Sequence, residues 1–204
     1  PSIRGLGLMP RLSLLENGEP RLRIMLDIDI RQSDLADEGF DLSIRCGRER
    51  IAERISLQLF EEHIFPVASP ELAAKIGDGE PARLLHYPLI NDSDASGWRA
   101  WFGQFGMNYH PRPQDRRFED YNLVLDAASY GLGIALARPP LTERQLAAGR
   151  IVPVDERKVL NPVSYWLDRP IGRPRAAAGE LAHRLGRMAG VPAERIEAFL
   201  AAEE

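Results

Sequence analysis

The feature that most constrains the fold is residues 39–72, which contain two strand patterns and the start of a helix. Residues 41–46 alternate polar and apolar side chains, as a partly buried β-strand does. After a charged turn, residues 63–68 are mostly apolar and β-prone, and Ser69 and Pro70 supply an N-cap and a first-turn proline for a helix. Open α/β sheets build ligand sites where a strand delivers a polar end to a helix N-terminus. The stretch therefore predicts an α/β fold with a binding site.

The rest of the chain continues to alternate strand and helix patterns, separated by glycine and proline. We expect helices at 3–15, 33–38, 70–76, 97–105, 121–130, 140–148, 176–188 and 193–202, and strands at 21–28, 41–46, 63–68, 87–91, 116–118, 134–137, 151–154 and 163–167. Such alternation predicts parallel sheets within the α/β class. Trp98, Trp101, Phe102 and Phe105 have helical spacing, which favours a place in the core.

Composition excludes several classes of function. The net charge of −4 offers no basic surface to a phosphate backbone, so this chain alone should not bind DNA. The single cysteine rules out an intrachain disulfide framework and suits a reducing compartment. No stretch approaches the roughly 20 apolar residues that span a bilayer, and the first residues do not resemble a signal peptide. We therefore expect a cytoplasmic protein without a membrane partner.

Residues 39–47 and 59–72 resemble the effector-binding domain of LysR-type transcriptional regulators, in the subgroup typified by the glycine-cleavage activator, and seven other segments match it in the expected order. They are Pro1-Ser2, residues 8–12, residues 34–41, Trp98-Arg99-Ala100-Trp101, Phe118-Glu119-Asp120, residues 131–136 and Tyr165-Trp166-Leu167. Each segment alone is weakly specific, and the ordered combination over nearly the whole chain carries the resemblance.

The resemblance implies two Rossmann-like lobes joined by two crossover strands, as in type 2 periplasmic binding proteins. Lobe one would comprise residues 1–66 and 167–204, and lobe two residues 67–166. The family carries a winged helix-turn-helix before this domain, and nothing in this chain corresponds to it. DNA binding would belong to that missing part. The resemblance also implies a small-molecule effector and a homodimer or tetramer, in which the helix at 3–15 meets lobe two of a neighbour.

The family holds its effector in a cleft between the lobes, and three predicted helix N-termini fall where the family lines that cleft. Helix N-termini attract carboxylates, which favours an anionic or zwitterionic effector. The candidate effector-binding residues are Ser2, Ile3, Arg45, Cys46, Ser69, Asp120, Tyr121 and Asn122. Simple N-capping is an equal alternative for Ser2, Ser69 and Asp120. Arg45 has the alternative of a solvated or salt-bridged strand end, and Cys46 that of a packed core residue.

Catalytic and cofactor patterns are weak. Gly5-Leu-Gly7 lacks the third glycine of a dinucleotide fingerprint, and the four histidines have no metal-ligand spacing. We interpret Glu61-Glu62 as a solvated strand start, because adjacent strand residues point to opposite faces. We expect no metal, no cofactor and no enzyme activity.

Two other classes of function stay open. A solute-binding protein of a transporter would use the same two-lobed fold, and an export signal or lipid anchor upstream would identify it. An enzyme on this fold would need an acid or base in the cleft, with Asp120, Asp92 or His86 as the first residues to replace in turnover assays.

Overall fold

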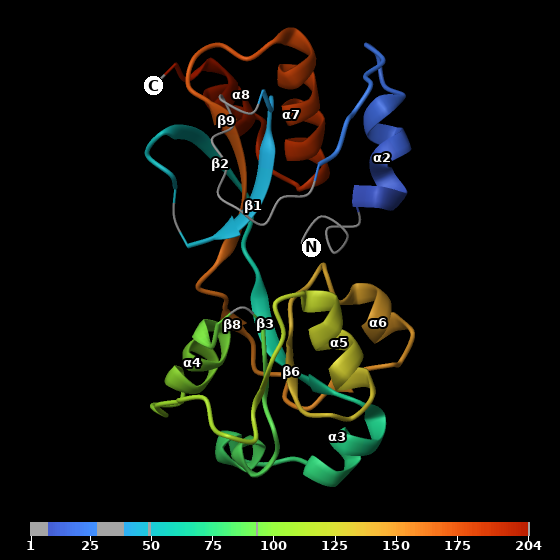
Figure 1. Cartoon of the computed structure of the whole chain (residues 1–204), viewed down its shortest axis with the longest axis vertical. Helices are drawn as coiled ribbons and strands as arrows, with labels where there is room; N and C mark the ends of the chain where they lie inside the picture. The colour runs from blue at the N-terminus through green and yellow to red at the C-terminus, as the bar shows by residue number, and fades with distance from the viewer. Residues whose placement is uncertain (1–7, 28–38, 49, 93, 204) are drawn as a thin grey trace. The chain divides into compact units, whose positions relative to one another are not determined.

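The computed structural model describes residues 8–27, 39–48, 50–92 and 94–203 (Figure 1). These residues form two compact units. The central unit comprises residues 62–162, and the terminal unit combines the described residues up to 61 with residues 163–203. The two crossings lie a few residues before the predicted boundaries at 66/67 and 166/167.

The terminal unit contains three strands and three helices in its described part (Figure 1). They are α2 (Leu8–Glu16), β1 (Ser43–Gly47), β2 (Arg54–Phe60), β9 (Ser164–Pro170), α7 (Ala176–Met188) and α8 (Ala193–Ala201). The strands form a sheet in the order β1-β9-β2 with both pairs antiparallel. Alternate residues Ile55, Leu57 and Leu59 of β2 are buried, as expected for a strand with one face against other elements, and α8 packs against β2.

A buried arginine fastens the end of α8 to β9. Arg169 is only 1% exposed, and its guanidinium donates to the carbonyl oxygens of Phe199 at 2.7 Å and Leu200 at 3.3 Å. It also donates to the carbonyl oxygens of Gly172 and Ala202. The last carbonyls of a helix have no partner within the helix, so a cation here both satisfies them and complements the helix dipole.

The central unit contains short helices and short strands, and the strands form a four-stranded sheet and a two-stranded sheet (Figure 1). They are β3 (His63–Ala68), α3 (Pro70–Ile76), the 3₁₀-helix η1 (Pro81–His86), β4 (Ile90–Asn91), α4 (Ser96–Gly103), β5 (Arg116–Arg117), α5 (Tyr121–Ser129), β6 (Ala135–Ala137), α6 (Glu143–Ala147), β7 (Val152–Pro153) and β8 (Val159–Leu160). β5 pairs parallel with β4, and a parallel bridge between Leu89 and Ile134 joins β4 to β6. β3 is antiparallel to β6, β7 and β8.

The aromatic residues of α4 lie in the core of the central unit, as predicted. Trp98, Trp101 and Phe102 are each at most 1% exposed. Trp101 packs edge-on against Phe105, with ring centroids 4.9 Å apart. The helix therefore contributes its large side chains to packing rather than to a ligand, as its 3.6-residue spacing indicated.

Two predictions about the strands differ from the structure of the described residues. Residues 21–27 belong to no strand, because the amides of Leu22 and Ile24 donate to the carbonyl and the carboxylate of Glu16. The expectation of parallel sheets holds only for the β4–β5 pair and the Leu89–Ile134 bridge, since all other strand pairs in this part of the chain are antiparallel. The predicted helix at 33–38 lies outside the described residues. No helix that the structure describes is long and apolar enough to cross a membrane.

Candidate functional site

Strand directions in the central unit gather charged residues at one edge of its sheet. β4, β5 and β6 run parallel, so the residues that follow them lie at the same edge: Asp92 after β4, Asp120 beyond β5 and Arg138 after β6. β3 is antiparallel to β6, so the residue that precedes β3, Glu62, also lies there. We call Glu62, Asp92, Asp120 and Arg138 the carboxyl edge. In open α/β sheets the carboxyl ends of parallel strands are where ligands bind.

Arg138 is the centre of this edge. Its side chain is 8% exposed and forms two ion pairs, from Nε to Glu62 Oε2 and from Nη1 to Asp92 Oδ2, each 2.8 Å long. The guanidinium also lies over the ring of Tyr121, 5.1 Å from the ring centroid. A planar guanidinium suits this combination because it can pair with two carboxylates and stack on an aromatic face at once. The first turn of α5 is therefore linked through Tyr121 to the ends of β3, β4 and β6.

Glu62 is fully buried, which corrects the interpretation of Glu61-Glu62 as a solvated strand start. Its Oε2 accepts from Arg138 and from Asn161 Nδ2 at 2.6 Å, whereas its Oε1 is buried without a hydrogen-bond partner. Removal from water raises the pKa of the Glu62 carboxyl above its ordinary value, against the opposing effect of the Arg138 charge. The sequence pattern treated both glutamates as solvated, because the burial of Glu62 depends on the neighbours that β3 acquires in the folded sheet.

Asp92 is the more accessible carboxylate, with 30% of its side chain exposed. Desolvation raises its pKa too; the nearby charge of Asp94 acts in the same direction, and that of Arg138 acts against it. Asp94 is exposed, and its Oδ1 accepts from the amide of Ser96 at the start of α4. The carboxyl edge thus joins a buried acid, a half-buried acid and one guanidinium.

The predicted residues Asp120, Tyr121 and Asn122 lie together at this edge. Asp120 is the N-cap of α5, because its Oδ1 accepts from the Asn122 amide at 2.9 Å and from Asn122 Nδ2 at 2.8 Å. The Tyr121 hydroxyl donates to the Leu136 carbonyl at 2.8 Å. Capping, one of the two interpretations of Asp120, is therefore present, and contact with an effector stays a prediction for all three residues.

The structure separates Ser69 from that group. Ser69 is the N-cap of α3, with its Oγ accepting from the Leu72 amide at 3.3 Å. Its own amide donates to the Ala128 carbonyl near the end of α5. β3 carries the chain about 23 Å from Glu62 to Ser69, at roughly 3.3 Å per residue. Ser69 and Asp120 therefore lie at opposite ends of α5 and cannot contact one small molecule together.

Arg45 and Cys46 belong to the terminal unit. Arg45 donates from Nε to the fully buried carboxylate of Asp168 and lies 5.5 Å from the ring centroid of Trp166. This is the salt-bridged alternative considered for it. Cys46 is exposed, which corrects its assignment to the core. In the described sheet β1 is paired only on its β9 side, and Cys46 lies near the end of that edge strand. Ser2 and Ile3 lie outside the described residues.

Sequence reasoning missed Arg138 and Glu62 as site residues. One signal for Arg138 was available, because a charge directly follows the apolar strand pattern at 134–137, as Arg45 ends the pattern at 41–46. No comparable signal marked Glu62. Among the described residues, no group of three or more His, Cys, Asp or Glu side chains is placed to hold a metal ion.

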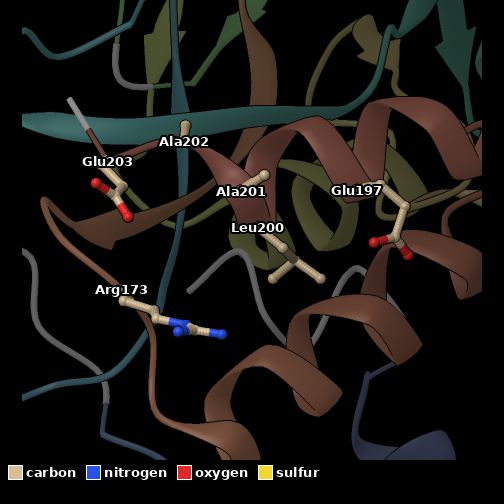
Figure 2. Close-up of a pocket in the computed structure, with 6 residues that line it drawn as sticks. All are labelled: Arg173, Glu197, Leu200, Ala201, Ala202 and Glu203. Carbon is tan, nitrogen blue, oxygen red and sulfur yellow. The ribbon is translucent and has the colours of Figure 1, made fainter.

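A separate hollow of about 350 Å³ lies in the terminal unit, between α8 and the segment after β9 (Figure 2). Its lining residues are Arg173, Glu197, Leu200, Ala201, Ala202 and Glu203. Figure 2 shows the side chain of Arg173 on one side and the last turns of α8 on the other. Of the predicted effector-binding residues that the structure describes, none lines it, so we do not include it in the site.

Comparison with known proteins assigns the class. The profile of the LysR substrate binding domain matches residues 1–188. Among solved structures, the effector domain of AmpR from Pseudomonas aeruginosa superposes with a TM-score of 0.81 at 30% identity, covering 93% of this chain and 91% of that one. The AmpR effector binding domain of Citrobacter freundii gives a TM-score of 0.79 at 26% identity, covering 93% and 94%. The fold class is thereby confirmed as that of two-lobed effector-binding domains.

The chain belongs to the LysR substrate-binding domain family, as the sequence predicted. The HTH-type transcriptional activator AmpR of Pseudomonas aeruginosa is 34% identical over 172 residues, which are 84% of this chain and 57% of the relative. The glycine cleavage system transcriptional activator of Escherichia coli K12 is 30% identical over 150 residues, 71% of this chain and 48% of the relative. The chain spans about half the length of these relatives. The family is one of transcription regulator domains rather than enzymes.

Proposed function

We propose that this chain senses a small polar effector for a DNA-binding transcription regulator, and that the effector binds at the carboxyl edge of the central unit. The observation that carries the proposal is Arg138, which brings two carboxylates and the first turn of α5 together at the ends of parallel strands. Asp120, Tyr121 and Asn122, which the sequence assigned to the effector, lie beside it. We keep these three residues and add Asp92 and Arg138.

Regulation follows from differential affinity. An effector shifts a regulator between two states only by the difference in its binding free energy for them, typically about 1–3 kcal/mol. Contacts with groups whose partners change between the states supply that difference. Asp92 and Arg138 are suited to this role, because an effector that pairs with one of them alters the ion pair between them.

DNA contact would come from residues other than these, because the net charge of −4 gives this chain no basic footprint. Such a regulator would act in the cytoplasm of a bacterial cell.

Each unit exposes large apolar side chains among its described residues, and these suit self-association. The terminal unit exposes Leu14 and Met25, at 73% and 90%, and the central unit exposes Leu123 and Tyr130, at 52% and 81%. Exposed apolar surface of this kind is lost from water when two copies associate. We propose that Leu14 and Met25 of one copy contact Leu123 and Tyr130 of a second copy, and the reverse, which makes a closed dimer.

Sedimentation tests this dimer. Met25→Glu should convert a dimer into a monomer, because it places a charge in the contact. Ile171→Glu is the matched control, since Ile171 is an apolar residue of the same unit that is 52% exposed and takes no part in the proposed contact. A wild-type chain that sediments as a monomer at high concentration would contradict the proposal.

A thermal-shift screen against amino acids, small carboxylates and muropeptide-like fragments tests effector binding. A ligand at 100 times its Kd stabilises the fold by about 2.7 kcal/mol, which moves the melting transition by several degrees. Saturable binding without turnover is the expected result. Consumption of a bound compound would favour the enzyme alternative.

Two capping residues then locate the site. Asp120→Ala and Ser69→Ala each remove a helix N-cap, at a similar cost of about 1 kcal/mol in stability, but only Asp120 lies at the carboxyl edge. Asp120→Ala should weaken effector binding at least tenfold, about 1.4 kcal/mol, and Ser69→Ala should leave it unchanged. Equal losses in both variants would show that the effector binds elsewhere.

A further inference from the structure

The charges at the carboxyl edge are unbalanced. Of the four residues that define the edge, Glu62 and Asp92 are carboxylates that both pair with the one guanidinium, that of Arg138. The carboxylate of Asp120 caps α5 at the same edge. Three neighbouring acids against a single cation leave excess negative charge, and such a potential raises the local concentration of positively charged ligands.

The hydrogen-bond inventory shows the same deficit of donors. An ionised carboxylate accepts through both oxygens and offers no donor. Glu62 has a side chain with no exposed surface, its Oε2 is bound by Arg138 and Asn161, and its Oε1 has no partner. A buried acceptor left unsatisfied costs about 1–3 kcal/mol. The carboxyl edge therefore has an acceptor, Glu62 Oε1, without a hydrogen-bond donor, and a ligand with an N–H group is able to supply one.

The helix N-terminus beside this edge does not favour an anion. The amide of Asn122 already donates to the carboxylate of Asp120, and the amides of Leu123 and Val124 donate to the Asp120 carbonyl. The negative charge of Asp120 itself compensates the positive end of the α5 dipole.

We propose that the carboxyl edge recognises the protonated amino group of the effector, with Asp92 as the accessible acceptor and Glu62 as the buried one. This inference rests on the proposed function and names the chemical class of the ligand as a primary ammonium compound. An ammonium group supplies three N–H donors and one positive charge. Asp92 is the point of entry, because 30% of its side chain is exposed whereas Glu62 has no exposed surface.

The first test uses the intact chain and two small probes, methylammonium chloride and sodium acetate, against potassium chloride at matched ionic strength. The carboxyl carbon of Asp92 is followed by NMR through a pH titration. Methylammonium should shift this resonance saturably and lower the apparent pKa of Asp92, because a bound cation favours the ionised carboxyl. Acetate should do neither. A methylammonium response no larger than that of potassium, or a saturable response to acetate alone, would overturn the inference.

Variants locate the response. Asp92→Asn keeps the shape of the side chain and an acceptor for Arg138 but removes the negative charge. The affinity for methylammonium should therefore fall at least tenfold. Binding to this variant is followed at the carboxyl carbon of Glu62. Glu119→Gln is the control, because Glu119 is an exposed acid of the same unit, 73% accessible and paired with Arg117. Circular dichroism confirms folding of both variants. An unchanged affinity in Asp92→Asn would refute the role of Asp92.

Paired compounds separate this inference from the proposed function. Every amine that stabilises the chain in the thermal-shift screen is compared with its N-acetyl derivative, which has lost the positive charge. Acetylation should abolish binding. An effector that binds equally well after acetylation would refute the inference and leave the sensing function intact. Methylammonium binding at Asp92 without any effector in the screen would support the site and count against the sensing function.

Discussion

The ion pair between Arg138 and Glu62 allows a quantitative prediction. Arg138→Met removes the guanidinium and keeps most of the side-chain volume, so Glu62 remains buried with Asn161 as its other hydrogen-bond donor. Leaving one partner of a buried pair uncompensated costs about 3–5 kcal/mol. For a chain of this size each kcal/mol lowers the melting temperature by about 2–4 °C, so the variant should melt roughly 10 °C lower.

A double-mutant cycle isolates the pair. Glu62→Gln alone should cost less than Arg138→Met, because Arg138 retains Asp92. Adding Glu62→Gln to Arg138→Met should restore stability, since a neutral amide no longer carries an unpaired charge. We expect a coupling energy of about 1–3 kcal/mol.

Tryptophan fluorescence during urea unfolding provides the assay. Trp98 and Trp101 are buried in the central unit, so a Trp166→Phe background confines the signal to the unit that contains the ion pair. A loss below about 1 kcal/mol for Arg138→Met at pH 7, or a loss that Glu62→Gln does not reduce, would refute the reasoning.

Three further predictions concern stability. Burial raises the pKa of Glu62 in the folded state, so the folded protein binds this proton more tightly than the unfolded chain does. The unfolding free energy should therefore fall as the pH rises through that folded pKa. Urea titrations of Glu62→Gln at several pH values should show a weaker pH dependence of this free energy than the wild type. Arg169→Met should lower the free energy of unfolding by at least about 3 kcal/mol and speed amide exchange in α8, because buried carbonyls left unpaired cost about 1–3 kcal/mol each. The control Arg173→Met replaces an exposed arginine and should change the free energy of unfolding little. Gly133→Ala should lower the melting temperature more than Gly149→Ala, because a Cβ at Gly133 would lie 2.5 Å from a backbone oxygen whereas Gly149 faces open space.

Local patterns predicted many of the elements. The helix at 176–188 was predicted with the bounds that α7 has, because apolar residues at helical spacing mark its buried face. The caps at Ser69 and Asp120 were also predicted, since an N-cap depends on the few residues that follow it. The strand β2 was missed, although Ile55, Leu57 and Leu59 alternate as in a strand with one buried face. The charged residues around that segment masked the alternation.

The sequence by itself therefore determined the family, the α/β class and the positions of most helices and strands, because these depend on local spacing and ordered motifs. The tertiary structure decided which charges are buried and which candidate residues lie together. Arg138 and Glu62 are 76 residues apart, and Asn161 and Glu62 are 99 apart. These contacts depend on the pairing of β3 with β6 and β8. The pattern of side chains along a strand does not specify which other strand pairs with it.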